Sequence, residues 1–388
     1  MNSFVAFIVK DLLGQASILI AFIAMLGLIL QKKSPGKTAE GTFKTLLGFL
    51  IMMAGINIIV ATLTFLNDIF TQGFGMKGYI TDVAAIAGLA NRELGSEVAL
   101  AQPVVRRITG SDDVALGHFC TIGYLVQAAV AKVVGKGSRS TEDLELPDNF
   151  KFLQDTYLAM AVVMVPMYLI PAIAAGPQYI AQFSGGINYL MYAFMQSIQF
   201  VAGVFVLYSG VRLLLNELVP AFRGIAMRIV PDAKPALDCP VLFPYAPNAV
   251  IVGFLATTVG SIIGMLVFPM FGLAMILPGL LTNFFAGGTA GVFGNALGGR
   301  RGAMIGGVIH GLFITFLPAI LVPMLESYGF TGVTFSDSDV ISSGLVLGHA
   351  FQNNWLFVAL FIVFVAALAW FVNGKSAKPK GESVHESV

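Results

Sequence analysis

The feature that most constrains this chain is a series of apolar runs, each long enough to cross a lipid bilayer as a helix. A spanning helix needs about 20 mainly apolar residues, because each residue adds about 1.5 Å against a hydrocarbon core of about 30 Å. Such runs lie near residues 12–30, 45–66, 156–175, 188–209, 248–270, 302–325 and 354–373.

Two weaker candidates complete the set. One is 114–135, which contains His118. The other is 271–297, whose glycines and prolines favour a re-entrant or broken helix as much as a full span. We therefore expect an all-α, polytopic membrane protein with eight or nine membrane-embedded segments.

Composition supports this fold class. The 388 residues are 57% hydrophobic and 11% charged, which leaves too little charge for the surface of a water-soluble globule. A net charge of +1 and the lack of Lys and Arg clusters argue against a nucleic-acid partner, so the expected partner is the lipid bilayer. Cys120 and Cys239 lie in or beside apolar segments, and their spacing indicates neither a disulfide framework nor a zinc site.

Lysines predict the orientation. The loop 31–44 carries four lysines against one acid, and the tail 374–388 carries three lysines, whereas the connection 326–354 has Asp337 and Asp339 but no Lys or Arg. Lys and Arg near helix ends favour the cytoplasmic side. We expect the loop and the tail to be cytoplasmic and the amino terminus to lie outside. The charged stretch 136–151 is interpreted as a solvated surface loop.

An internal repeat favours a transporter. The helix 48–60 matches 203–215 position for position, with Gly48 and Gly55 aligned to Gly203 and Gly210. A second pair follows in the same order, Leu116-Gly117-His118 and Leu347-Gly348-His349, each after an Asp-rich stretch. Duplicated and often inverted halves that bracket a midplane site are common in transporters.

The first copy is short. From Gly203 to His349 is 146 positions, but from Gly48 to His118 is only 70. The shortfall falls near 100–101, since Arg106 and Arg107 end the apolar run that begins at Ser96 after ten positions. We predict a first repeat at 1–155, a second at 156–373 and a polar tail at 374–388, with 96–105 forming a short surface or partly inserted segment beside a void. A deletion and a longer parent protein both explain the shortening.

Several motifs resemble the ascorbate-type permease (IIC) components of the bacterial phosphoenolpyruvate-dependent phosphotransferase system. In chain order they are Glu40-Gly-Thr-Phe-Lys-Thr-Leu-Leu-Gly-Phe49, Ser140-Thr-Glu-Asp-Leu-Glu-Leu-Pro147, Gly210-Val-Arg-Leu with Glu217-Leu-Val-Pro-Ala-Phe-Arg-Gly224, Ala236-Leu-Asp238-Cys239-Pro, Tyr245-Ala-Pro-Asn248-Ala-Val and Gly291-Val-Phe-Gly-Asn295.

The resemblance implies a homodimeric helical permease of a bacterial inner membrane, built from inverted repeats. It would carry a sugar to the cytoplasm, where a separate phosphorylated IIB protein, supplied by IIA, phosphorylates it. Members of the family have further membrane segments where this chain passes from Leu100 to Ala101. They also have Gln after the His that matches His118, where this chain has Phe119, and Val83 and Ala84 follow Asp82 where they have polar and aromatic residues. Ascorbate is therefore no more expected than another sugar or sugar acid.

Candidate substrate-binding residues follow from chemistry and from this resemblance. An ionisable group at membrane depth is costly unless it is paired or faces a polar cavity, which points to His118 and Asp238. Asp238 lies in a Pro-rich stretch that cannot be one helix, and it could bind two sugar hydroxyls or cap the next segment. His118 could donate to a sugar oxygen or serve only in packing. The full set is His118, Asp238, Gly55, Asp82, Asn248 and His349.

Three function classes remain open on the sequence. The first is the phosphotransferase permease, the second an ion- or proton-coupled secondary transporter, and the third a non-transporting membrane remnant. The sequence shows no catalytic triad, P-loop or metal-ligand cluster, so we expect no cofactor and no covalent chemistry on this chain. Phosphoryl transfer would belong to the partner.

Overall fold

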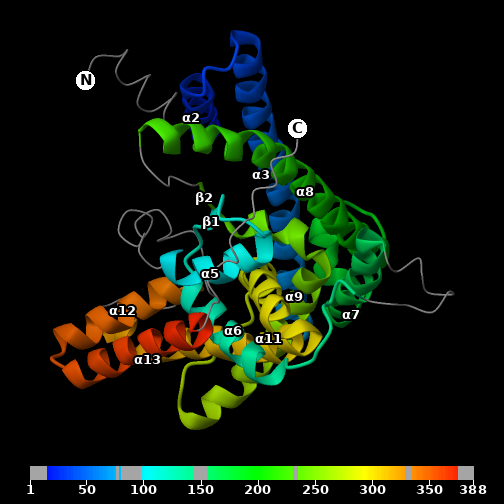
Figure 1. Cartoon of the computed structure of the whole chain (residues 1–388). Coiled ribbons are helices and arrows are strands. Elements are labelled where there is room, and N and C mark those ends of the chain that lie inside the picture. Colours follow the sequence, from blue (N-terminus) through cyan, green and yellow to red (C-terminus); the bar gives the residue numbers. More distant parts are fainter. Residues whose placement is uncertain are drawn as a thin grey trace, which may run out of the picture.

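The structure is a computed structural model that describes residues 15–75, 78–79, 98–143, 155–229, 235–327 and 334–374. Within these ranges the fold is almost entirely helical, as the sequence predicts, and six helical segments are long and apolar enough to cross a membrane (Figure 1). The long helices are α3 (Pro35–Gly73), α7 (Thr156–Ser184), α8 (Tyr189–Arg228), α9 (Pro247–Val267), α11 (Gly288–Ser327) and α13 (Trp355–Asn373).

Shorter elements connect them. They are α2 (Ala16–Leu30), α5 (Val98–Thr109), β1 (Ala115–Leu116), α6 (Thr121–Val134), β2 (Ala236–Leu237), the 3₁₀ helices η3 (Cys239–Tyr245) and η4 (Phe268–Phe271), α10 (Leu280–Thr282), the π-helical turn η5 (Asn283–Gly287) and α12 (Ser338–Phe351). The predicted helix 114–135 is wrong at its start. Its first third is β1 and a turn that holds His118, and the helix begins only at Thr121.

Glycines bring α3 and α8 into backbone contact. A Cβ added at Gly48 would lie 3.2 Å from the carbonyl oxygen of Gly210, and one added at Gly55 would lie 2.8 Å from that of Gly203. Only small residues permit so close an approach of two helices. Gly48 thus faces Gly210, which is the repeat counterpart of Gly55, and Gly55 faces Gly203, the counterpart of Gly48. This exchange is the pattern of a two-fold related pair. The inverted repeat of the whole halves stays a prediction.

The interrupted stretch after η4 forms a broken helix. The chain is irregular before α10, and α11 is itself broken at Gly299, where φ is 56° and ψ is −151°. A Cβ added at Gly294 would lie 2.7 Å from the carbonyl oxygen of Gly302, although eight residues of straight helix would separate these positions by about 12 Å. The two arms of α11 thus fold back on each other as a helical hairpin.

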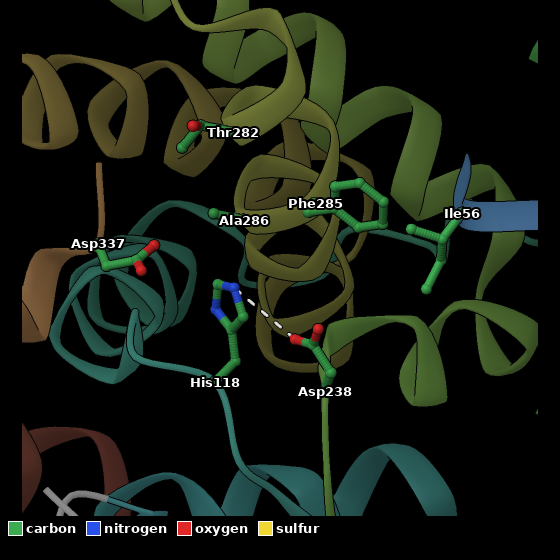
Figure 2. Close-up of a pocket in the computed structure, with 7 residues that line it drawn as sticks. All are labelled: Ile56, His118, Asp238, Thr282, Phe285, Ala286 and Asp337. Atoms are coloured by element: carbon green, nitrogen blue, oxygen red, sulfur yellow. Dashed lines mark ion pairs between the residues drawn. The ribbon is translucent and has the colours of Figure 1, made fainter. Parts of the chain in front are cut away.

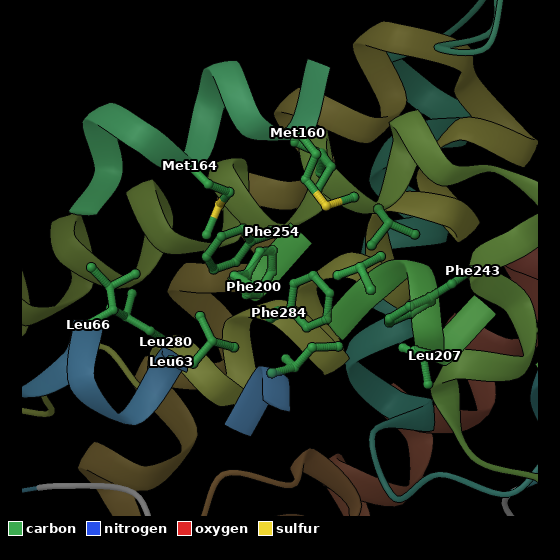
Figure 3. Close-up of a cluster of buried hydrophobic side chains, with 14 of the residues drawn as sticks. Leu63, Leu66, Met160, Met164, Phe200, Leu207, Phe243, Phe254, Leu280 and Phe284 are labelled. Carbon is green, nitrogen blue, oxygen red and sulfur yellow. The ribbon is translucent and has the colours of Figure 1, made fainter. Parts of the chain in front are cut away.

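Aromatic and aliphatic side chains fill the space between α3, α7, α8 and the broken helix (Figure 3). The ring of Phe284 in η5 packs edge to face on Phe200, Phe243 and Phe254, with centroids 5.0 to 5.7 Å apart. Such offset aromatic pairs stabilise a core beyond the area they bury. This cluster fixes the π-helical turn against three other elements.

The outer surface of the bundle is apolar. Figure 1 shows α12 and α13 together at one edge of the molecule, and α13 exposes large apolar side chains that include Leu356, Leu360 and Trp370. In water such a face would be unfavourable, whereas in lipid it is the expected surface. The bilayer is therefore the solvent that this fold requires.

The segment around Leu100 is short, as predicted, but it is not a surface segment. The backbone passes through Leu100 and Ala101 without interruption inside α5. Ala101 and Val105 are fully buried in a cluster with residues of α6 and α11. Of the two predicted positions, a surface segment does not fit, because Ala101, Val104 and Val105 give the short helix a buried apolar face opposite Arg106 and Arg107. Partial insertion into the membrane stays a prediction.

Candidate functional site

Two short parallel strands place the two principal candidate residues side by side. Ala115 pairs with Ala236 and Leu116 with Leu237, and the N–H of Gly117 donates to the carbonyl oxygen of Leu237 at 2.7 Å. His118 and Asp238 follow the ends of these strands, and the Nε2 of His118 lies 3.8 Å from the Oδ1 of Asp238. Residues 120 positions apart are thus brought to one place by backbone pairing.

Of the two roles that the sequence left open for Asp238, the structure shows the cap. Asp238 is the N-cap of η3, and its Oδ1 accepts the backbone N–H of Cys239 at 2.7 Å and the thiol of Cys239 at 3.2 Å. Its side chain is nevertheless 65% exposed. All these contacts fall on Oδ1, so among the described residues Oδ2 keeps its acceptor capacity for a ligand.

A buried tyrosine orients His118. The hydroxyl of Tyr124 lies 2.7 Å from Nδ1 of His118, and the two rings stack with centroids 6.1 Å apart. Tyr124 is itself fully buried against Phe293 and His310. With Nδ1 engaged, Nε2 is the nitrogen that faces Asp238.

The start of α12 closes the third side of the site. Asp339 accepts the backbone N–H groups of Thr121 and Ile122 at 2.8 and 2.9 Å, and Ser338 accepts that of Gly123 at 3.1 Å, so the first residues of α12 cap α6. The neighbouring Asp337 accepts the Cys120 thiol at 3.5 Å. Burial raises the pKa of the Asp337 carboxyl and raises that of Asp339 to about 6.

These residues surround a pocket of about 190 Å³. Figure 2 shows the His118 ring between the carboxylates of Asp337 and Asp238, with the other walls from α3, α10 and η5. The lining residues are Ile56, His118, Asp238, Thr282, Phe285, Ala286 and Asp337. The pocket therefore offers two carboxylates, an imidazole and a hydroxyl beside an aromatic ring, which is the chemistry that sugar-binding sites use.

Comparison with known proteins decides the family. The family described as PTS system sugar-specific permease component (EIIC-GAT) matches residues 11–103 and 97–339. The chain belongs to this family. The two matched parts overlap at 97–103, the place where the repeat spacing predicts the shortening.

One curated relative of the permease family is the ascorbate-specific PTS system EIIC component of Mycoplasma pneumoniae. It is 24% identical over 282 residues, which are 65% of this chain and 42% of the relative. The match thus spans less than half the length of that relative.

The other residues predicted for the permease site lie elsewhere. Gly55, one position before the pocket residue Ile56, packs against the backbone of Leu207. Asn248 lies in the first turn of α9, and its N–H donates to the carboxylate of Glu142 at 3.2 Å. The Ser140-Thr-Glu motif therefore caps the start of α9. His349 contacts Asn354 and stacks on Phe357.

Asp82 lies outside the described residues. The charged stretch 136–151 is likewise more than a solvated loop where the structure describes it, since Thr141 is buried and its N–H donates to Asn295 at 2.8 Å.

Sequence reasoning missed five lining residues. Ile56, Phe285 and Ala286 are apolar and carry no signal that separates a pocket wall from a core position. Asp337 contributed only a negative charge to the prediction of orientation. In the repeat it aligns with the Asp-rich stretch before His118, which was a hint that it lies near the site. Thr282 could have been suspected from its place beside the predicted helix break, because broken helices commonly line transporter sites.

Proposed function

We propose that this chain is the membrane permease subunit of a phosphotransferase system and binds a sugar or sugar acid in the pocket between His118 and Asp238. The observation that carries the proposal is the meeting of these two residues at the ends of β1 and β2, next to a broken helix, in a chain of the permease family. The site lies where both sequence halves contribute polar groups, as transporter sites commonly do.

Each group in the pocket has a role in sugar binding. The exposed carboxylate of Asp238 accepts hydroxyl groups of the sugar, and charge-assisted bonds of this kind are stronger than neutral ones. His118, held by Tyr124, donates or accepts through Nε2. The faces of Ile56 and Phe285 receive the C–H surface of the ring, and Thr282 supplies a hydroxyl.

The charge of the pocket favours an uncharged polyol over a sugar acid. Asp238 and Asp337 both line it, and an anionic substrate would be repelled by both unless His118 is protonated. The named relative is ascorbate-specific. Isothermal titration of the purified protein with ascorbate and with a neutral hexitol compares the two classes, and tighter binding of ascorbate at pH 8 would contradict the preference for a neutral ligand.

Group translocation is tested in proteoliposomes. With the phosphorylated IIB partner and its IIA donor supplied, uptake should require phosphoenolpyruvate and should yield the sugar phosphate inside. Accumulation driven by a proton or sodium gradient without phosphoenolpyruvate would identify a secondary transporter instead. Binding of the sugar without uptake under either condition would identify the non-transporting alternative.

Assembly and orientation belong to the same proposal. The resemblance to homodimeric permeases supports a homodimer, and the lysines of the loop 31–44 and of the tail support cytoplasmic positions for these two segments. Single cysteines placed at Lys33 and at Lys378 should resist an impermeant thiol reagent in intact cells and react after permeabilisation. Strong labelling in intact cells would reverse the topology.

A further inference from the structure

We propose that the pocket also binds a thiophilic divalent cation such as Zn²⁺, held by His118, Asp238 and Cys239. Nitrogen, oxygen and sulfur of these three residues lie within 4.8 Å of one another. The set of one imidazole, one carboxylate and one thiolate is typical of zinc ligands, and three protein ligands leave a fourth position for water. No sequence pattern indicated this site, because the pairing of β1 with β2 brings His118 and Cys239 together from distant positions in the sequence.

The distances are close to those that a metal needs. Tetrahedral Zn²⁺ with bonds of about 2.0 Å to nitrogen and oxygen and about 2.3 Å to sulfur sets its ligand atoms about 3.3 to 3.5 Å apart. The Sγ of Cys239 is 3.2 Å from Oδ1 of Asp238, and the Nε2 of His118 is 3.8 Å from the same oxygen. Sγ and Nε2 lie within 4.8 Å of each other, so metal binding requires the imidazole to move toward both the carboxylate and the sulfur.

The surroundings suit a metal ligand. Zinc-bound histidines commonly have the second ring nitrogen in a hydrogen bond that fixes the tautomer, and Tyr124 provides that contact at Nδ1. The carboxylate is 65% exposed toward the pocket, so a hydrated ion can reach it, while Cys239 is fully buried behind it. On binding, the Cys239 thiol gives its proton to water and the sulfur bonds to the metal.

A second group in the same pocket supplies a matched control. His118, Cys120 and Asp337 also lie within 4.8 Å of one another. Cys120 is as buried as Cys239 and also contacts a carboxylate, but at 3.5 Å. Because Nε2 of His118 faces Asp238, the geometry points to Cys239 as the sulfur ligand. The chain has two cysteines, so a metal–thiolate signal that survives Cys120→Ser comes from Cys239.

The test is a Cd²⁺ titration of the purified full chain, followed by the ultraviolet thiolate-to-Cd²⁺ charge-transfer band. The wild-type protein and Cys120→Ser should both show one thiolate per bound Cd²⁺. Cys239→Ser should lose the band and weaken Cd²⁺ binding at least about tenfold, since even loss of a residue that only hydrogen-bonds a metal ligand costs about 10- to 100-fold. A wild-type protein without the band, or a band lost in Cys120→Ser, would overturn the assignment.

X-ray absorption at the zinc edge of the wild-type protein gives an independent answer that needs no variant. The expected spectrum has one sulfur among nitrogen and oxygen ligands. A shell of nitrogen and oxygen only would place the metal away from Cys239 and contradict the proposal. Neither readout depends on sugar transport, so failure of the metal site leaves the proposed permease function untouched.

Discussion

The crossing of α3 and α8 and the junction of β1 and β2 join distant parts of this chain in opposite ways. At the crossing, the glycines have no side chains, so the two helix backbones touch, and no polar side chain is needed. At the junction, four strand residues pair through backbone hydrogen bonds and leave His118 and Asp238 at their ends. The crossing therefore tolerates no added volume, whereas the junction tolerates changes of shape but depends on polar groups.

The largest effect should come from adding one methyl group at the crossing. In Gly210→Ala the new Cβ would lie 2.2 Å from the backbone nitrogen of Met52, which no side-chain rotation can relieve. We expect a loss of about 3 kcal/mol or more of stability, measured by thermal unfolding in detergent. Gly36→Ala in α3 meets no atom within 4 Å and should be neutral. Equal stability of the two variants would refute the close helix contact.

At the junction, Asp238→Asn should damage binding and spare the fold. Asparagine caps a helix start as well as aspartate does, so the N-cap of η3 survives. Loss of the charged acceptor should cost about 1 to 3 kcal/mol of binding, or roughly a ten- to hundred-fold weaker affinity for the preferred sugar in titration calorimetry. Asp113→Asn, which breaks only the surface pair with Arg223, is the control. Unchanged affinity in Asp238→Asn would leave Asp238 as a cap alone.

A smaller effect is expected at the residue that orients His118. Tyr124→Phe removes the hydroxyl that contacts Nδ1, and the sugar affinity should fall by about 0.5 to 1.5 kcal/mol, or about two- to ten-fold. Tyr208→Phe is matched, because that hydroxyl is buried without a partner among the described residues. If both variants bind alike, the Tyr124 contact has no part in the site.

On the junction side, stability should also depend on pH. Burial raises the pKa of Asp339 to about 6, above its unfolded value of about 3.9, so the folded state binds this proton more tightly. Stability should then fall as pH rises from about 4 to 6 and stay lower above that range. In Asp339→Asn the melting temperature should vary less over this range than in the wild type. An identical pH profile would remove Asp339 as the cause.

Much of the fold could be predicted because bilayer length and apolar runs are local properties of the sequence. The helices α3, α7, α8, α9 and α13 cover the predicted runs, and the Pro-rich stretch 235–247 forms β2 and η3 instead of one helix. The hairpin inside α11 could be suspected from Gly299 and its glycine neighbours, but its closure depends on which glycines meet in space.

The site was predictable only in part. His118 and Asp238 stood out because ionisable groups are rare at membrane depth. Their contact could not be foreseen, since two-residue strands have no pattern strong enough to read. His349 was aligned to His118 by the repeat, yet it packs on Phe357 because it lies inside α12, whereas His118 lies in the turn before α6.

The central claim is that His118 and Asp238 act together on one ligand, and a double-mutant cycle measures this most directly. Sugar affinity would be determined for the wild type, His118→Gln, Asp238→Asn and the double variant, with His349→Gln and Asp238→Asn as the control pair. The account predicts a coupling of about 0.5 to 3 kcal/mol for His118 with Asp238 and additivity for His349 with Asp238. Additive losses for His118 and Asp238, or no loss from either, would contradict it.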